Sequence, residues 1–390
     1  MKILQIVTYI SPDGAYGGPV RVAINQAKAL TDLGHEVVLA ATAGGFRGPL
    51  PHEFDGFPVT LFPARRLVPG TGFAGMTSPG LLRWLRMAIL GADVVHVHLA
   101  RDLVTLPAAA LAILFKKPVV IQTHGMIDFS AKLLARPLDC IFTRPVLKQA
   151  GAVLFLTKRE CGDLVEVAGD GLKLQFLPNG VDLRHAETYD LLENAHHDRE
   201  VQVLYLARLH ARKRPLTFVK AATYLLHEGS EATFHLVGPD EGEGKAIKSA
   251  IESAETQSSV IYEGPAAPHE TYERLSQSDI YVLPSIDEPF PMSVIEAMAS
   301  GKPVIVTDSC GLAPYVKSSG AGIIIDDKLH SLTQAIDYLV RNRDKREAMG
   351  NQGRQLVERE FRIQAVATRL AHIYQEVSLG RKVYPNEVDV

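Results

Sequence analysis

Residues 280–301 read IYVLPSIDEPFPMSVIEAMASG, and this stretch predicts the strand, loop and helix around which the chain is organised. The apolar run at its start is typical of a buried strand, which the following proline ends. Pro291 stands where a helix would begin, a position at which its missing N–H costs nothing. The free amides of Met292 and Ser293, at the positive end of the helix dipole, would then offer a site for an anion.

Two glutamates flank the predicted anion site. Glu288 lies in the loop before the helix, and Glu296 lies within the helix. As an isolated pair they would usually be a loop acid and a solvated helix residue. Carboxylates are poor neighbours for phosphate but accept hydrogen bonds from sugar hydroxyls. The arrangement therefore suits a ligand that carries both a phosphate and a sugar.

The same stretch resembles the Glu-x7-Glu signature of family 4 of the retaining glycosyltransferases. Glu288 and Glu296 are the two acids of this signature. Glu296 is the first residue of the sequence Glu-Ala-Met-Ala, which Gly301-Lys302-Pro303 follows. One departure is Pro289, which stands where the family often has glycine or another small residue. Its rigid ring could reshape the contacts with the hydroxyls of the sugar.

The composition of the chain is that of a soluble globular protein. Of its 390 residues 46% are hydrophobic and 22% are charged, and this length predicts two domains of roughly 180 residues each. The formal net charge of -3 argues against a nucleic-acid-binding protein. The three cysteines are far apart and odd in number, which predicts neither a disulfide framework nor a metal site and fits a reducing, cytoplasmic compartment. The first residues predict a strand rather than a signal peptide, and no stretch approaches the ~20 apolar residues of a membrane span.

The N-terminal half alternates predicted strands and helices, which indicates a parallel sheet covered on both faces. Its first unit is a strand over residues 3–8, a glycine-containing loop, a helix over 19–33 and a strand over 36–41. Gly17 and Gly18 allow a close approach of the backbone, just before a helix whose free amides could face an anion. Glycines that serve only turn geometry are equally consistent with the pattern. In the resembling family, the equivalent Gly-Gly loop lies against the donor phosphate and the acceptor.

His124 is the histidine that the pattern places at a ligand-binding edge. It comes directly after the strand predicted over residues 119–122, and open α/β sheets bind their ligands at the carboxyl ends of strands. The run Thr-His-Gly also resembles a family motif whose histidine reaches the donor sugar near the reacting bond. His96 and His98 share one face of an earlier strand, and such histidines are more often hydrogen-bonded core or edge residues.

Two cations follow the first strand of the second half. Arg208 ends the strand predicted over residues 201–207, Lys213 lies in the next loop, and Gly238, which we assign to the same nucleotide-sugar site, ends the strand over 233–237. Arginine can bridge two phosphate oxygens and lysine supplies a point charge, which suits a diphosphate. Taken alone these would be ordinary surface cations. Their place about 80 residues before the first glutamate, at the head of a second Rossmann-like unit, matches the family.

Two segments of the N-terminal half mix basic and apolar side chains. One runs over residues 132–148 and contains a single acid, and the other includes Arg65, Arg66, Arg83 and Arg86. Both are either ordinary solvated helix faces, or a patch that rests on anionic lipid or grips a lipid diphosphate acceptor.

The resemblance spans nearly the entire chain and implies the GT-B architecture, in which two Rossmann-like α/β domains with doubly wound parallel sheets face each other across a cleft. The motif LPNGVD, at residues 177–182, marks the join between domains in the family. We predict an N-terminal acceptor-binding domain, a linker, a C-terminal domain that binds the nucleotide-sugar, and a last helix that crosses back to the N-terminal domain. Their predicted ranges are 1–182, 183–200, 201–362 and 363–390.

The resemblance implies transfer of a hexosyl group from a UDP- or GDP-linked sugar to a glycan or lipid-linked acceptor, with retention at the anomeric carbon and without a metal or other cofactor. Arg208 and Lys213 would stabilise the departing nucleoside diphosphate, and Glu296 would hold its ribose. Glu288 and His124 would orient the sugar. The expected place is the cytoplasm, with peripheral contact at the inner face of the plasma membrane.

Three other classes of protein share parts of this pattern. A nucleotide-sugar epimerase has the same architecture but is expected to lack the full Glu-x7-Glu signature. An NAD-dependent oxidoreductase needs a Gly-x-Gly-x-x-Gly loop and an acid after the second strand, and the chain shows neither. A periplasmic sugar-binding protein would share the hinge but should carry a secretion signal.

Overall fold

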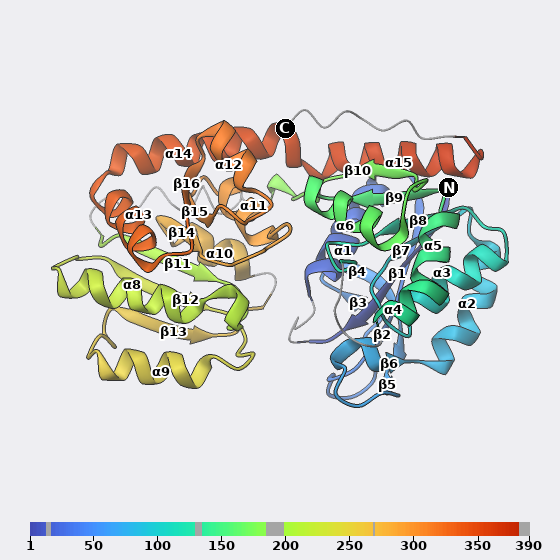
Figure 1. Cartoon of the computed structure of the whole chain (residues 1–390), viewed down its shortest axis with the longest axis horizontal. Helices are drawn as coiled ribbons and strands as arrows, with labels where there is room; N and C mark the ends of the chain where they lie inside the picture. The colour runs from blue at the N-terminus through green and yellow to red at the C-terminus, as the bar shows by residue number, and fades with distance from the viewer. Residues whose placement is uncertain (13–16, 129–134, 185–198, 268–269, 382–390) are drawn as a thin grey trace. The chain divides into compact units, whose positions relative to one another are not determined.

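The computed structural model describes residues 1–12, 17–128, 135–184, 199–267 and 270–381. Within them the chain forms two α/β units (Figure 1). The first unit contains Met1–Gly180 and the helix that begins at Ile363, and the second contains Val181–Arg362. Most of the linker predicted over residues 183–200 lies outside the described residues. None of the helices described combines the length and the apolar character needed to cross a membrane.

The first unit alternates strands and helices, as its sequence pattern predicts. Its strands are β1 (Lys2–Ile10), β2 (Glu36–Ala43), β3 (Glu53–Phe54), β4 (Phe57–Pro63), β5 (Arg65–Arg66), β6 (Met76–Thr77), β7 (Val94–His98), β8 (Val119–Gln122), β9 (Ala152–Phe155) and β10 (Leu174–Phe176). Its helices are α1 (Gly17–Asp32), α2 (Pro79–Gly91), α3 (Thr105–Leu114), α4 (Ala135–Leu138), α5 (Arg144–Gln149), α6 (Lys158–Ala168) and α15 (Ile363–Ser378), with a π-helical turn over Asp139–Thr143. Among the described residues, eight strands form a sheet in the order β10-β9-β8-β7-β1-β2-β4-β3, with parallel neighbours except at the antiparallel pair of β3 and β4.

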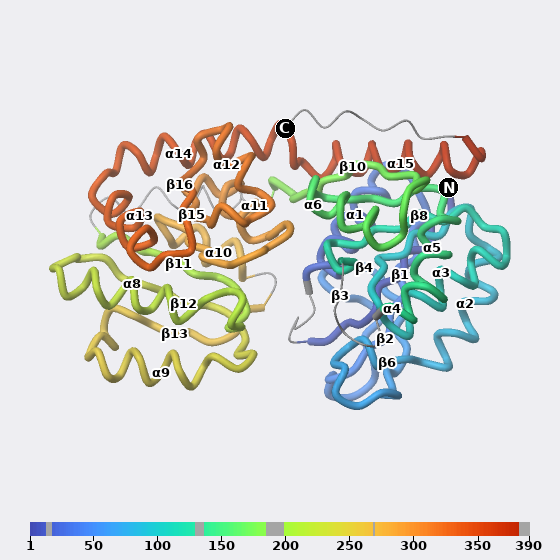
Figure 2. Tube along the Cα trace, viewed as in Figure 1, coloured from blue at the N-terminus to red at the C-terminus, as the bar shows by residue number. Residues whose placement is uncertain are grey.

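Helices cover both faces of this sheet because its strands are apolar on both sides. One face carries α2, α3, α5 and α6, whose leucines, valines and alanines pack on Leu4, Val95 and Ile121. The other face carries α1 and α15, which pack on Ile3 and Val120. Figure 2 shows α15, at the red end of the chain, next to the green β10, and α15 shares a buried cluster with Ala152 and Leu154 of β9. The last helix therefore completes a core that the first 180 residues begin.

The second unit repeats the pattern. Its strands are β11 (Gln202–Leu206), β12 (Thr233–Val237), β13 (Val260–Gly264), β14 (Ile280–Leu283), β15 (Val304–Thr307) and β16 (Gly322–Ile325). Its helices are α8 (Pro215–His227), α9 (Gly244–Ser253), α10 (Thr271–Ser276), α11 (Met292–Ala299), α12 (Ala313–Ser319), α13 (Leu329–Arg341) and α14 (Arg343–Leu356). In the described part of this unit the six strands run parallel in the order β13-β12-β11-β14-β15-β16. Helices α8, α9 and α13 share one buried cluster with the sheet. Apart from that cluster, α11 packs against β14 and β15, and α12 packs against β15 and β16.

Each sheet reverses its strand order beside the first strand of the unit. In the first unit β1 lies between β2 and β7, and in the second unit β11 lies between β12 and β14. Open α/β sheets bind ligands beyond the carboxyl ends of the strands at such a switch point. The loops after β1, β7 and β8, and those after β11 and β14, are therefore the places where functional side chains are expected.

Candidate active site

The loops after β11 and β14 meet at the switch point of the second sheet. Arg208 and Lys213 follow β11 and Glu288 follows β14, and these two strands are neighbours. Lys213 Nζ donates a hydrogen bond to Glu288 Oε2 at 2.6 Å, and Arg212 Nη2 lies 3.3 Å from the same oxygen. The Ile286 amide also donates to the Arg212 carbonyl at 3.0 Å, which joins the two loops through the backbone. Lys213 and Glu288 therefore form an ion pair, and Arg212 is a third member that sequence reasoning missed.

The pair of Lys213 and Glu288 is largely shielded from water, with 13% and 12% of the two side chains exposed. Burial alone would raise the pKa of Glu288, but Lys213 and Arg212 outweigh burial and hold that pKa below its usual value. Burial lowers the pKa of Lys213, and Glu288 opposes that shift. Each partner thus favours the charged form of the other, which fixes a cation and a carboxylate at the edge of the sheet.

Two buried tyrosines support these loops. The Tyr205 hydroxyl donates to the carbonyl oxygens of Arg208 and Lys213, at 3.2 and 3.4 Å. The Tyr281 hydroxyl lies 2.6 Å from Ser293 Oγ, at the start of α11, and 3.1 Å from the last carbonyl oxygen of β11. The cationic loop and the first turn of α11 are thus tied to adjacent strands of one sheet.

The sequence predicts that the helix begins at Pro291. In the structure α11 begins at Met292, so Pro291 is the residue before the helix. The reason is that Pro291 has an extended backbone with ψ of 113°, which makes it the cap of the helix. The amides of Met292 and Ser293 are still the first of the helix and lack partners within it. Glu296 is only 2% exposed, which rules out the solvated-helix interpretation of this residue.

Arg208 lies at the same edge and is held by a second carboxylate. Its Nη1 atom lies 2.9 Å from both carboxylate oxygens of Glu241, another residue that no sequence motif indicated. Gly238 packs against this loop so closely that a Cβ atom on it would lie 2.0 Å from the Ala207 carbonyl oxygen. With its φ of +150°, Gly238 holds a position that only glycine can occupy without strain.

In the first unit, His124 lies in the turn after β8, where the sequence predicts it. Its φ of +52° is left-handed, which is uncommon for a residue other than glycine. Glu160 of α6 holds the turn, because its buried carboxylate accepts hydrogen bonds from the Thr123 hydroxyl and the Gly125 amide, both at 2.5 Å. Sequence reasoning missed Glu160, although Thr157 and Glu160 have the spacing of a helix capping box.

His96 and His98 are fully buried, in agreement with their interpretation as core residues. His98 Nδ1 nevertheless lies 2.8 Å from His124 Nε2, so one of them contacts the turn. Burial lowers the pKa of His96 and of His124 to about 3, and lowers that of His98 well below its usual value. No group of three or more His, Cys, Asp or Glu side chains within the described ranges is arranged to hold a metal ion.

Gly17 and Gly18 are the first two residues of α1, and six residues separate them from the end of β1. Gly18 is exposed, and a Cβ atom added to it would meet nothing within 4 Å. Packing inside the first unit therefore does not explain this glycine. The preceding loop, residues 13–16, lies outside the described residues.

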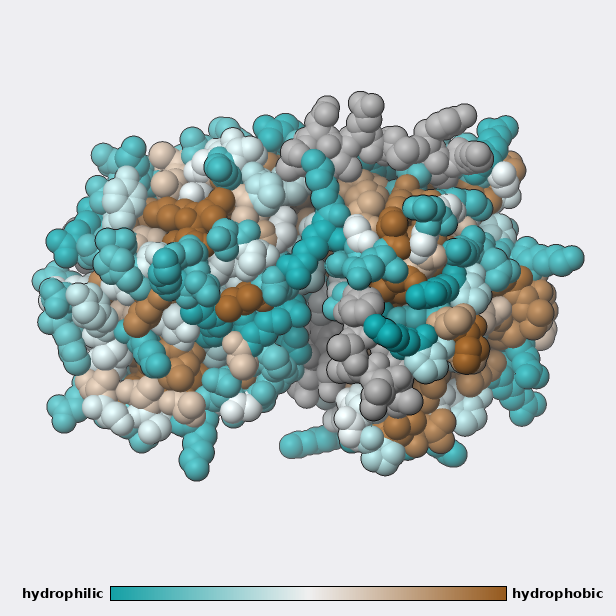
Figure 3. Space-filling view, in the orientation of Figure 1, coloured by the Kyte–Doolittle hydropathy of each residue, from teal (hydrophilic) through white to brown (hydrophobic). Residues whose placement is uncertain are grey.

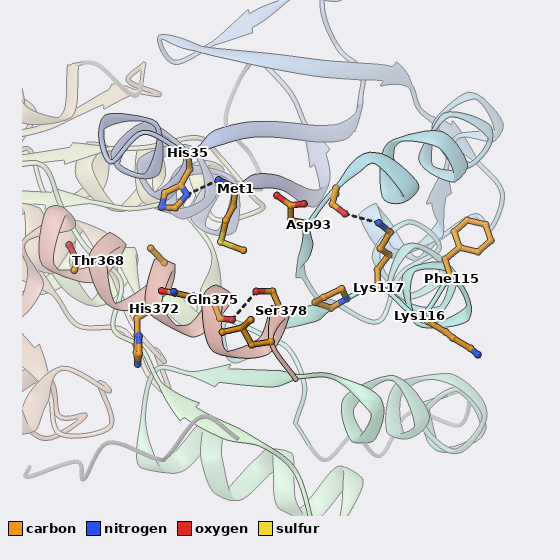
Figure 4. A pocket seen from close by; sticks show the side chains of 14 residues that line it. Met1, His35, Asp93, Phe115, Lys116, Lys117, Thr368, His372, Gln375 and Ser378 are labelled. Atoms are coloured by element: carbon orange, nitrogen blue, oxygen red, sulfur yellow. Dashed lines mark hydrogen bonds between the residues drawn. The ribbon is translucent and has the colours of Figure 1, made fainter. Parts of the chain in front are cut away.

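The cavity drawn in Figure 4 lies at the other edge of the first sheet. Its volume is about 1060 Å³, and its lining includes Met1, His35, Asp93 and Pro118, which immediately precede β1, β2, β7 and β8, together with His372 of α15. It opens at the amino ends of the strands, whereas His124 follows a carboxyl end. The cavity is therefore separate from the predicted site.

Comparison with known proteins identifies the family. A family model described as Glycosyltransferase Family 4 matches residues 16–185, and one described as Glycosyl transferases group 1 matches residues 192–356. The alpha-D-kanosaminyltransferase of Streptomyces kanamyceticus is 24% identical over 67% of this chain and 71% of its own length. The UDP-Gal:alpha-D-GlcNAc-diphosphoundecaprenol alpha-1,3-galactosyltransferase of Escherichia coli is 25% identical over 74% of this chain and 76% of its own.

The fold agrees with these matches. The HepE protein of Anabaena, solved in complex with UDP and glucose, has a TM-score of 0.75 and 19% sequence identity to this chain, and covers 96% of this chain and 99% of its own. These comparisons do not favour an epimerase or an NAD-dependent oxidoreductase. The chain belongs to the GT-B glycosyltransferases of group 1 and family 4.

Proposed function

We propose that this glycosyltransferase moves a hexosyl group from a UDP- or GDP-linked sugar to a glycan or lipid-linked acceptor, with retention of configuration and without a metal ion. The observation that carries this proposal is the shielded pair of Lys213 and Glu288, joined by Arg212, at the switch point of the second sheet. A sheet edge with fixed cations and a helix start is suited to a diphosphate.

The transfer breaks the bond between the anomeric carbon and the β-phosphate oxygen and forms a bond from that carbon to an acceptor hydroxyl oxygen, which loses its proton. Negative charge therefore develops on the departing nucleoside diphosphate. Arg208, Lys213 and the amides of Met292 and Ser293 would stabilise that charge in the way that a divalent metal ion does in other enzymes. Because these groups are already fixed by the sheet, little reorganisation is needed during the reaction. Glu296 would accept hydrogen bonds from the ribose hydroxyls.

Glu288 and His124 would orient the transferred sugar, and the Gly17 and Gly18 backbone would approach the donor phosphate and the acceptor. No side chain is assigned as a nucleophile. Two relatives support these substrate classes by their names. The Escherichia coli relative is named for a UDP-galactose donor and a diphosphoundecaprenol-linked acceptor, and the Anabaena protein was solved with UDP and glucose.

The test of the proposal is a panel of UDP-, GDP- and ADP-sugars, offered with lipid-diphosphate and oligosaccharide acceptors in the presence of EDTA. We expect one donor to be consumed at a rate that the chelator does not change. NMR coupling constants of the product should show the same anomeric configuration as the donor. An inverted product, or activity that EDTA abolishes and Mg²⁺ restores, would contradict the proposal.

We also propose that the first unit contacts an anionic membrane surface. Met87 of α2 is 74% exposed to solvent, and Leu114 at the end of α3 is 71% exposed. Ile141, in the adjacent π-helical turn, is also exposed. Arg83 and Arg86 lie on the same helix as Met87. Figure 3 shows brown, hydrophobic side chains among teal ones on the part of the first unit that carries α2 and α3. Apolar groups beside basic ones are typical of a surface that inserts shallowly between anionic head groups.

Vesicle sedimentation tests this second proposal. The chain should sediment with vesicles that contain phosphatidylglycerol and much less with pure phosphatidylcholine, and added salt should weaken the binding. A variant with Met87→Glu and Leu114→Glu should lose the binding, whereas Leu329→Glu, at an exposed leucine of α13 in the second unit, should keep it. Equal binding by both variants would contradict the proposed surface.

A further inference from the structure

A row of polar side chains runs through the core of the first unit, on the sheet face that α1 and α15 cover. Along β7 the inward positions change from Val94 to His96 and His98 toward the carboxyl edge. Gln5 is paired with His96 across the sheet, and Gln122 is paired with His98, and all four are buried. Burying polar groups in an apolar core costs free energy unless they make specific bonds. We therefore expect these polar side chains to have a role other than packing.

The row forms one continuous series of contacts that ends at His124. His98 Nδ1 lies 2.8 Å from His124 Nε2, and the two rings are within 8° of parallel. The ring of His96 stacks on His98 with centroids 4.4 Å apart. His96 Nδ1 lies 2.7 Å from the hydroxyl of Tyr374, which comes from α15, and the Gln5 amide donates to that hydroxyl at 3.4 Å.

The hydrogen-bond directions in this series are constrained by its burial. The three imidazoles are neutral near pH 7, since burial lowers the pKa of each. Because Gln5 donates to the Tyr374 oxygen, the Tyr374 hydrogen can be given to His96. Between His98 and His124 a single hydrogen is shared, so one ring donates and the other accepts. That bond leaves Nδ1 as the ring nitrogen that His124 can offer to a ligand, and it sets whether Nδ1 donates or accepts.

We propose that His98 is a positioning residue that fixes the ring orientation and the tautomer of His124. The inference rests on the proposed function, in which His124 contacts the transferred sugar. Glu160 holds the turn on both sides of His124, through the Thr123 hydroxyl and the Gly125 amide, while His98 contacts the ring. A side chain fixed at both ends presents one defined polar atom to the sugar, as partners of metal-ligating histidines do in other sites.

Two substitutions at His98 separate positioning from packing. His98→Asn keeps an amide near the place of Nδ1, whereas His98→Phe keeps the ring volume and removes the bond. We expect His98→Phe to lower kcat/KM for transfer about 10- to 100-fold and His98→Asn to stay within about threefold of the wild type. Affinity for UDP or GDP should be unchanged in both variants, because the second unit is proposed to bind the nucleotide. His235→Phe, a histidine of the second unit outside the site, is the matched control and should keep wild-type activity.

The nitrogen-15 NMR spectrum of the His124 ring is a measurement that does not depend on activity. The signals of this ring are assigned as those that are missing from the spectrum of His124→Gln. The wild type should show one neutral tautomer at pH 7, and His98→Phe should show a mixture. A single tautomer in His98→Phe, or equal losses of activity in His98→Phe and His98→Asn, would overturn the proposal. If the wild type consumed no nucleotide-sugar, the proposed function would fail. The NMR comparison of the His124 tautomer in the wild type and His98→Phe would still test whether His98 positions His124.

Discussion

At the scale of single residues, the proposed chemistry depends on one shielded ion pair. Lys213 and Glu288 share a hydrogen bond of 2.6 Å, and removing one partner of a buried pair leaves the other charge without compensation. The pair also links the loops after β11 and β14, together with the backbone bond from the Ile286 amide to the Arg212 carbonyl. Its loss should therefore affect stability as well as activity.

The stability contributed by Glu288 should depend on pH. Its pKa in the folded chain lies below the value of 4.5 expected without its partners, so its stabilising effect is complete above pH 4.5 and is lost as pH falls through the lower, folded pKa. We expect Glu288→Gln to lose about 3 kcal/mol of unfolding free energy at pH 7 and clearly less at pH 3. Urea unfolding at several pH values measures this difference. Glu252→Gln, an exposed glutamate, is the control, and a difference for Glu288→Gln that does not vary with pH would contradict the account.

Sequence reasoning identified Lys213, Glu288 and Arg208 but could not identify all of their partners. Glu288 and Lys213 stand in motifs, whereas Arg212 and Glu241 lie in no motif and become visible only when strands far apart in sequence are side by side. Burial is a further property that sequence reasoning could not assign. The pattern of Glu296 alone favours a solvated residue, and only the packed helix shows that it is enclosed.

At the scale of elements, the site depends on turns that the sheets hold at their carboxyl edges. Buried parallel strands such as β8 and β14 are largely apolar runs of four residues, and this pattern predicts them. The short strands β3, β5 and β6 carry no such signal, because two residues cannot show a period. Helix α14 ends at Leu356, and the chain continues as a π-helical turn over Val357–Phe361.

The turn that carries His124 should depend on Glu160. Glu160→Ala removes the acceptor of the hydrogen bonds from Thr123, Gly125 and Leu156, and we expect a loss of about 3 kcal/mol in unfolding free energy. Glu166→Ala, an exposed glutamate on the same helix, should change it by less than about 0.5 kcal/mol. Thermal and urea unfolding compare the two variants. Equal unfolding free energies of the two variants would show that the hydrogen bonds accepted by Glu160 do not stabilise the fold.

The loop that carries Arg208 should depend on Gly238. A methyl group there would collide with the Ala207 carbonyl oxygen, so Gly238→Ala should cost about 3 kcal/mol or more and weaken nucleotide binding. Gly242 also has a positive φ, but a Cβ atom on it would meet nothing within 4 Å, so Gly242→Ala should cost about 1 kcal/mol. Calorimetric unfolding measures the loss of unfolding free energy in both variants. Similar losses in Gly238→Ala and Gly242→Ala would argue against the close contact at Gly238.

At the scale of the whole molecule, the end of the chain completes the core of the first unit. The resemblance predicts that the last helix crosses back to the N-terminal domain, but it does not say against which strands the helix packs. The packed structure supplies that partner, since Leu370, Ile373 and Tyr374 join a cluster with Ile3 and Val120. The same helix provides the hydroxyl that begins the series of contacts toward His124.

Weakening α15 should therefore loosen the first unit and spare the second. Leu370→Ala should cost about 2 to 5 kcal/mol and speed hydrogen exchange in β1 and β8. Exchange in β11 and β14 should not change, because these strands belong to the other unit. Leu379→Ala, at an exposed leucine after the same helix, is the control. Faster exchange in both units would show that their cores are not independent.

The central claim is that fixed cations at the edge of the second sheet bind the diphosphate without a metal ion. Isothermal titration calorimetry of UDP and GDP, in buffer that contains EDTA, tests it directly. The account predicts that the wild type binds one of these nucleotides and that Lys213→Ala binds it at least about tenfold more weakly, a loss of about 1.4 kcal/mol. Equal binding by Lys213→Ala, or binding by the wild type that disappears with EDTA, would contradict the account.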